Sequence, residues 1–149
     1  MKLVVKTFSS NETIKLGKKI AVFLNRHDVI TLNGDLGAGK TTFVKGIAKF
    51  FGLNKIKSPT FNIIKCYFKS KIPIYHIDLY RLEKVDQNIG LEEYIEGDGI
   101  AIVEWSVFLN KKIKIPHLDV TIKNIGVNKR EIIFKTFDQY YEEKIKKIF

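Results

Sequence analysis

Residues 34–41 constrain the fold of this chain more than any other segment. They run Gly34-Asp35-Leu36-Gly37-Ala38-Gly39-Lys40-Thr41, between an apolar run at 29–33 and a helix-like run at 41–51. Glycines let the backbone turn back with its N–H groups pointing inward, in front of a helix N-terminus, which forms a nest for an anion. A lysine and a hydroxyl residue after such a nest are placed to contact phosphate oxygens and Mg²⁺. The segment therefore predicts a strand–loop–helix unit that holds phosphate.

Length and composition bound the class of protein. A chain of 149 residues is typical of one domain, so we expect a single domain across 1–149, with a C-terminal helix at 138–149. The apolar share of 45% excludes wholesale disorder. Cys66 is the only cysteine, which excludes an intrachain disulfide, and no apolar run approaches the ~18 residues of a membrane span. We expect a cytoplasmic protein that does not enter the membrane.

The net charge of +10 has two interpretations. It could mark a surface that meets RNA or an acidic partner, or it could reflect lysines spread over the whole surface. The lysines never form a long run, and only Arg26, Arg81 and Arg130 could make two-pronged contacts with phosphate. The second interpretation is therefore favoured.

Periodicity and turn signals predict strands and helices mixed along the whole chain. Strands are expected at 2–8, 29–33, 61–68, 72–80 and 99–105, with a late hairpin at 118–123 and 130–137 around "NIGVN". Helices are expected after Ser9, at 41–51 and at 138–149, with an interrupted helical pattern at 82–96. Ser9 and Glu12 fit a capping box at the start of the first helix. This mixture predicts an α/β fold.

A phosphate-binding loop of this kind needs an acidic contact from the end of another strand. Glu104 ends "IAIVE" and Asp78 ends "IYHID", so both carboxylates are expected at the edge of the sheet. One would contact the metal and the other would orient water, and spacing alone does not assign the two roles. Thr60 in "SPT" is a third candidate, as a switch-like hydroxyl for Mg²⁺ or as part of an ordinary turn.

Two residues beside these carboxylates have structural interpretations. His76 has no cysteine or histidine partner at zinc spacing, so it is predicted to be a strand residue with a hydrogen-bonded ring rather than a metal ligand. Trp105, which follows Glu104, is compatible with plain core packing.

Four segments, in this order and at these separations, together resemble the TsaE (YjeE) family. They are "GDLGAGKTTF", "SPTF", "HIDLYRL" and "VEW", and the resemblance covers roughly residues 10–135. It implies a P-loop NTPase-like, three-layer α/β/α fold with a mostly parallel central sheet. It also implies a small ATPase that supports threonylcarbamoyl transfer to a tRNA adenosine by acting on two partner proteins of the TsaB and TsaD type. Contact with tRNA would be indirect, and nucleotide-dependent self-association stays open.

The resemblance also implies roles for individual residues. The phosphates of ATP would be held by the loop, here Gly34, Asp35, Leu36, Gly37, Ala38, Gly39, Lys40, Thr41 and Thr42. Mg²⁺ would be bound by Thr41 and Glu104. Asp78 would support hydrolysis together with Lys40 and Glu104.

Four more residues match places that the family uses around the nucleotide. Thr60 would act as a switch residue and Trp105 would lie beside the site. Thr13 on the first helix and Arg130 in "NKRE", on a late strand, would lie around the nucleotide.

Three other functions are typical of proteins with such a loop. A small P-loop kinase would close an arginine-bearing lid over the phosphates, and no arginine lies in a polar, lid-like segment. A GTPase is disfavoured because "NKRE" has Glu131 where a guanine-reading motif has aspartate, and because it leads into a strand. An assembly factor that binds nucleotide with negligible hydrolysis stays open, as does the kinase.

Overall fold

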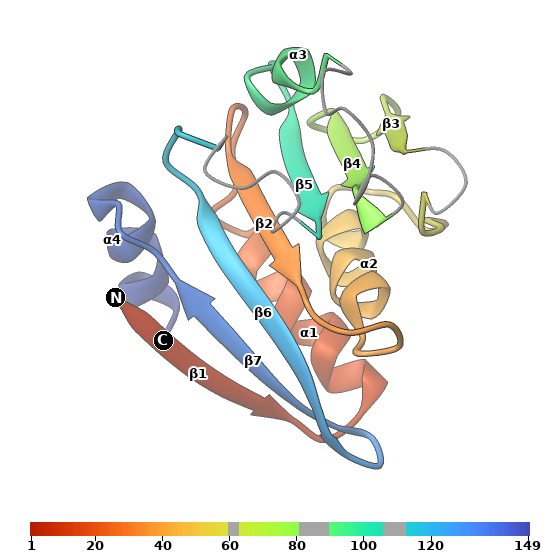
Figure 1. Cartoon of the computed structure of the whole chain (residues 1–149), viewed down its shortest axis with the longest axis vertical. Coiled ribbons are helices and arrows are strands. Elements are labelled where there is room, and N and C mark those ends of the chain that lie inside the picture. Colours follow the sequence, from red (N-terminus) through yellow and green to blue (C-terminus); the bar gives the residue numbers. More distant parts are fainter. Residues whose placement is uncertain (60–62, 81–89, 106–112) are drawn as a thin grey trace.

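A seven-stranded sheet forms the centre of the computed structural model, which describes residues 1–59, 63–80, 90–105 and 113–149 (Figure 1). The strands are β1 (Lys2–Thr7), β2 (Val29–Asn33), β3 (Ile64–Tyr67), β4 (Ile74–Asp78), β5 (Ile100–Glu104), β6 (Leu118–Gly126) and β7 (Lys129–Lys135). The helices are α1 (Ser10–Ala21), α2 (Lys40–Phe50), α3 (Glu92–Ile95) and α4 (Gln139–Ile148). In this described part no helix is long and apolar enough to cross a membrane.

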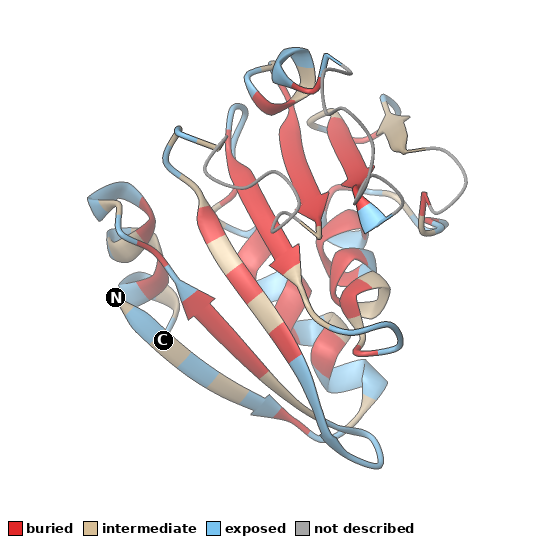
Figure 2. Cartoon of the chain, viewed as in Figure 1, coloured by how far each residue is buried: buried red, intermediate tan, exposed pale blue. Residues whose placement is uncertain are grey.

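The strand order is β1-β7-β6-β2-β5-β4-β3, and its centre is parallel. β2 pairs in parallel with β5 and β6, and β4 pairs in parallel with β5. The edges are antiparallel, through the β3–β4, β6–β7 and β1–β7 pairs. Strands buried on both faces require continuous apolar runs, and Figure 2 shows β2, β4 and β5 almost wholly buried. The predicted α/β class, with a parallel centre and a late antiparallel hairpin, is confirmed.

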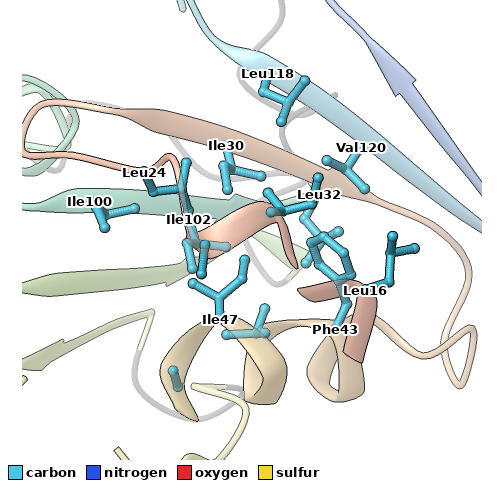
Figure 3. Close-up of a cluster of buried hydrophobic side chains, with 14 of the residues drawn as sticks. Leu16, Leu24, Ile30, Leu32, Phe43, Ile47, Ile100, Ile102, Leu118 and Val120 are labelled. Atoms are coloured by element: carbon cyan, nitrogen blue, oxygen red, sulfur yellow. The ribbon is translucent and has the colours of Figure 1, made fainter. Parts of the chain in front are cut away.

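Alternating side chains of the central strands divide the core into two clusters. On one face, α1 and α2 pack against β2, β5 and β6; Figure 3 shows Leu16, Phe43 and Ile47 facing Ile30 and Leu32. α4 belongs to the same cluster through two buried side chains and lies beside α1. On the opposite face the described residues contain one short helix, α3, over β4 and β5. Among the described residues, the helical layer with α1, α2 and α4 is therefore larger than the one with α3.

Helix α1 begins with the predicted Ser9 cap, and the predicted return bond of Glu12 goes to Phe8, one residue before Ser9. The Ser9 hydroxyl accepts a hydrogen bond from the Glu12 N–H at 3.1 Å, and the Glu12 carboxylate accepts one from the Phe8 N–H at 2.7 Å. α1 then crosses α2 at a pair of glycines. A Cβ at Gly17 would lie 2.3 Å from the Phe43 carbonyl oxygen, and one at Gly46 would lie 2.1 Å from that of Ile14. Only glycine therefore permits this close approach.

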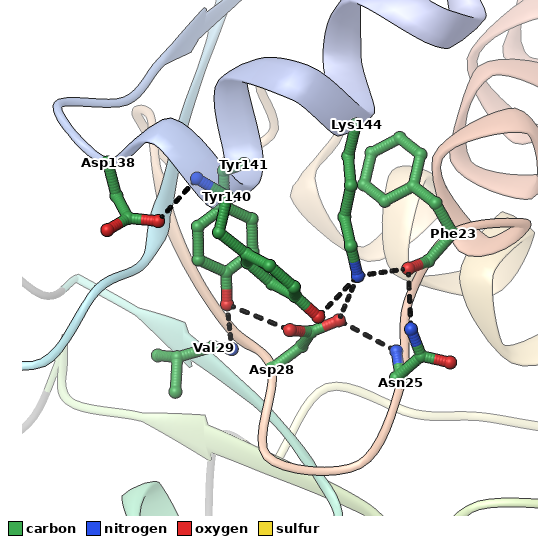
Figure 4. Close-up of polar contacts among 8 residues, drawn as sticks. All are labelled: Phe23, Asn25, Asp28, Val29, Asp138, Tyr140, Tyr141 and Lys144. Carbon is green, nitrogen blue, oxygen red and sulfur yellow. Dashed lines mark hydrogen bonds and ion pairs between the residues drawn. The ribbon is translucent and has the colours of Figure 1, made fainter.

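Helix α4 is tied to the start of β2 by polar contacts (Figure 4). The Tyr141 hydroxyl accepts a hydrogen bond from the Val29 N–H at 2.9 Å and donates one to the Asp28 carboxylate at 3.2 Å. The Lys144 ammonium lies 3.4 Å from that carboxylate and donates to the Phe23 carbonyl at 2.7 Å. The predicted C-terminal helix thus has a structural role.

Several boundaries differ from the sequence prediction. β6 continues to Gly126 and β7 begins at Lys129, so most of "NIGVN" is strand and the turn is Val127–Asn128, with Asn128 at φ +57°. Of the strand expected at 61–68, the described residues form β3 over Ile64–Tyr67, and 61–62 lie outside them. Of the helical pattern at 82–96, the described residues form only α3, and 81–89 lie outside them.

Candidate functional site

The glycine-rich loop connects β2 to α2 across the carboxyl edge of the sheet. Gly39 precedes the helix at φ +108°, a left-handed conformation that other residues rarely adopt, and it has no side chain to cap the first-turn N–H groups. Gly34 presses on β6, where a Cβ would lie 2.4 Å from the Ile122 carbonyl oxygen. The loop therefore presents backbone donors and the positive end of the helix dipole to an anion.

Lys40 folds back over this loop. Its ammonium donates hydrogen bonds to the carbonyl oxygens of Gly34 at 2.6 Å and Asp35 at 3.1 Å, and it lies 4.4 Å from the centre of the Trp105 ring. Burial lowers the pKa of Lys40, and the negative charges of Glu104, Asp78 and Asp35 partly oppose that shift. The ammonium is thus poorly hydrated, which strengthens its interaction with an incoming phosphate.

Two carboxylates stand beside the lysine. Asp78 and Glu104 are register partners at the ends of β4 and β5, and they are only 7% and 2% exposed. Burial raises the pKa of Asp78; the Tyr80 N–H, which donates to its carboxylate at 3.0 Å, opposes the rise, and the nearby charge of Glu104 adds to it. The two acids therefore lie where parallel α/β sheets bind ligands, outside the carboxyl ends of the strands.

A pocket of about 260 Å³ brings the loop and the strand ends together. Its lining consists of Leu36, Gly37, Gly39, Lys40, Thr41, Thr42, Ser58, Asp78, Tyr80, Glu104 and Trp105. Trp105 has left the strand geometry at φ +59°, and its ring lies 4.9 Å from that of Tyr80. Ser58 and Tyr80 were not predicted to be site residues. The signal for Tyr80 was its position two residues beyond Asp78 in the sequence.

A smaller hollow of about 30 Å³ lies on the other side of Gly39 and Thr42. Thr13 and Arg130 both line it. The Arg130 Nε donates to the Ala38 carbonyl at 2.7 Å, so the guanidinium lies against the loop, and the Thr13 hydroxyl is 2.7 Å from that of Thr7. The structure thus brings both residues to the loop. Thr60 lies outside the described residues.

His76 differs from its prediction. Its ring is fully buried, and neither nitrogen has an aligned hydrogen bond among the described residues; Nε2 lies 3.3 Å from Glu104 Oε2. The prediction of a hydrogen-bonded ring was wrong, because strand alternation places His76 on the same face as the apolar core.

The oxygen atoms that line the pocket suit a hard cation bound partly by the protein and partly by a nucleotide. Among the described residues, no three His, Cys, Asp or Glu side chains are spaced to hold a metal by themselves. The pocket instead offers the Thr41 hydroxyl and two carboxylates, which are oxygen ligands of the kind Mg²⁺ accepts beside phosphates and water.

This fold and this loop define the class of P-loop α/β proteins. The profile of the family described as "Threonylcarbamoyl adenosine biosynthesis protein TsaE" matches residues 7–132. The chain therefore belongs to the TsaE family.

Individual relatives agree with that assignment. The tRNA threonylcarbamoyladenosine biosynthesis protein TsaE of Bacillus subtilis is 43% identical over 138 residues, which are 92% of this chain and 87% of the relative. The protein of the same description from Rickettsia conorii is 42% identical over 126 residues, covering 82% and 71%. The crystal structure of YdiB from Bacillus subtilis superposes with a TM-score of 0.86 at 37% identity, covering 99% of this chain and 94% of that one.

Proposed function

We propose that this chain is a Mg²⁺-dependent ATP-binding and ATP-hydrolysing subunit of tRNA threonylcarbamoyladenosine biosynthesis. It supports threonylcarbamoyl transfer to a tRNA adenosine by acting on a two-protein transferase complex of the TsaB and TsaD type. One observation carries the ATPase part: Lys40 and Thr41 of the loop share a single pocket with Asp78 and Glu104. Family membership and the descriptions of the relatives support the pathway.

The residues divide the work by position. The loop N–H groups and Lys40 bind the β- and γ-phosphates. To reach them, the Lys40 ammonium gives up its hydrogen bonds to the carbonyl oxygens of Gly34 and Asp35. Thr41 and Glu104 hold Mg²⁺, which neutralises charge on the phosphates when bound. Asp78, fixed by the Tyr80 N–H, orients the attacking water. Trp105 and Tyr80 contact the nucleotide from the wall of the pocket, and Thr13 and Arg130 contact it from the smaller hollow.

ATP binding or hydrolysis then resets the transferase complex between cycles, without chemistry on the base itself. Contact with tRNA is indirect in this scheme. The protein works in the cytoplasm, because the tRNA that the pathway modifies is there.

The test combines retention of the partner proteins with ATP turnover. We expect the immobilised chain to retain the TsaB- and TsaD-type proteins when ATP and Mg²⁺ are present, and its weak ATPase rate to rise when they are added. Lys40→Ala should remain folded by circular dichroism but lose ATP binding by calorimetry, because the mobile phosphate-binding charge is gone.

The rival functions give different results in the same assay. Retention of the partners and ATP binding without any ADP formation would replace the ATPase with a nucleotide-binding assembly factor. Absence of retention, together with phosphate transfer to a nucleoside or sugar, would replace it with a kinase. Unchanged ATP affinity in Lys40→Ala would remove the loop from the proposal.

A further inference from the structure

His76 lies at the boundary between the core and the nucleotide pocket. In the β4–β5 register, Asp78 stands opposite Glu104, and one step earlier on the same face His76 stands opposite Ile102. Ile74 and Ile102 on this face are wholly buried in the cluster beneath α1 and α2. On this face of β4, the imidazole is therefore the last side chain before Asp78.

Core packing does not explain an imidazole at this position. The ring is 0% exposed, and both of its nitrogens lack an aligned hydrogen bond to any residue that the structure describes. A buried polar group without a partner destabilises the fold, and an apolar side chain of similar volume would fill the same space without that cost. Among the described residues, one charged group lies close to the ring: Glu104 Oε2 is 3.3 Å from Nε2.

The two carboxylates are held by different groups. The Tyr80 N–H donates to Asp78 Oδ1 at 3.0 Å. The Glu104 side chain has one more rotatable bond than that of Asp78. His76 Nε2 contacts its carboxylate from the core side and can hold it in one orientation. Hydrogen bonds of this kind are often long or poorly aligned in the free protein and tighten when the ligand binds.

We propose that His76 is a positioning residue for Glu104. Its Nε2–H donates to one oxygen of the Glu104 carboxylate and leaves the other oxygen for the metal that accompanies the nucleotide. This inference rests on the proposed function, because it assigns Glu104 to Mg²⁺. Groups that orient metal-binding side chains from behind typically change metal affinity 10- to 100-fold when they are removed.

The experiment measures how much Mg²⁺ strengthens nucleotide binding. The affinity for an ATP analogue with an imido β–γ bridge is measured by calorimetry in Mg²⁺ and in EDTA. His76→Leu should lower the Mg²⁺ affinity of the complex about tenfold or more, with analogue affinity in EDTA within about twofold of wild type. His76→Gln should retain most of the Mg²⁺ effect, because its amide N–H reaches the same oxygen. Ile102→Val is the matched control: it trims the opposing core residue and should leave the Mg²⁺ effect unchanged.

The outcomes separate this inference from the proposed function. Wild-type protein that binds no analogue in either condition would overturn both. Wild-type binding with a normal Mg²⁺ effect in His76→Leu, or His76→Gln no better than His76→Leu, would overturn the positioning role alone.

A second measurement needs no variant. Long-range ¹H–¹⁵N spectra of the wild-type protein should show a slowly exchanging proton on His76 Nε2. A ring protonated only at Nδ1 would overturn the inference, even if the His76 variants failed to fold.

Discussion

At the scale of single residues, burying the charged groups of Asp78 and Lys40 lowers the stability of the folded protein. Burial raises the pKa of Asp78 and lowers that of Lys40, so each charged form is less stable in the folded protein than in water. For Asp78 the folded pKa exceeds the ordinary value of 3.8, so the folded state binds the proton more tightly. The stability that the folded protein gains from a protonated Asp78 is therefore fully present below pH 3.8. It is lost as the pH rises through the raised pKa.

Asp78→Asn should consequently stabilise the free protein at pH 7, because it removes a buried charge and keeps the oxygen that accepts from the Tyr80 N–H. We expect the melting temperature to rise by a few degrees, the gain to shrink as the pH falls, and ATP turnover to be lost. Thermal melts between pH 4 and pH 7 measure this, with the exposed Glu143→Gln as a control that should show neither effect. A less stable Asp78→Asn protein at pH 7 would mean that attraction to Lys40 outweighs the burial of the carboxylate.

At the scale of elements, the contact between α1 and α2 fixes the helix that begins at the loop. Gly46→Ala would place a Cβ 2.1 Å from the Ile14 carbonyl oxygen, so the two helices must separate. We expect a loss of about 1–3 kcal/mol in the free energy of unfolding, measured in urea, although alanine is the better helix former. Lys45→Ala, on the exposed face of α2, is the control and should change stability by less than about 0.5 kcal/mol. Equal stability of Gly46→Ala and wild type would show that the crossing can widen freely.

Local signals explain which elements the sequence could predict. β2 was predicted with its observed bounds because an apolar run ends at Gly34, and α1 was predicted from its capping box. Lys40, Asp78 and Glu104 were predicted to meet because a loop motif and two strand ends must share one edge of a parallel sheet.

Contacts between distant segments could not be predicted in this way. Nothing in the periodicity marks Gly17 and Gly46 as a crossing point, since each lies in an ordinary helical pattern. The contact between His76 Nε2 and Glu104 Oε2, at 3.3 Å, depends on how β4 and β5 lie side by side. The Tyr141–Asp28 hydrogen bond joins residues 113 positions apart.

At the scale of the whole molecule, one end of β2 leads to the nucleotide pocket and the other end is part of a contact that stabilises the fold. Its carboxyl end leads into the phosphate-binding loop, while its first residue, Val29, is held by α4 at the opposite edge of the sheet (Figure 4). Burial raises the pKa of Tyr141, and its hydroxyl satisfies the Val29 N–H and a buried carboxylate together. Stability and nucleotide binding should therefore be separable by mutation.

Tyr141→Phe tests that separation. It removes only the hydroxyl and leaves the Val29 N–H without its partner, so we expect a loss of about 1–3 kcal/mol in the free energy of unfolding. ATP affinity measured by calorimetry well below the melting temperature should be unchanged, because the loop end of β2 is untouched. Tyr140→Phe is the matched control: Tyr140 is 45% exposed and its hydroxyl accepts from the Lys144 side chain rather than from a buried backbone N–H, so the stability of this variant should stay within about 0.5 kcal/mol of wild type. A Tyr141→Phe protein that keeps its stability but binds ATP more weakly would show that α4 acts on the nucleotide site through β2 instead of holding the opposite edge.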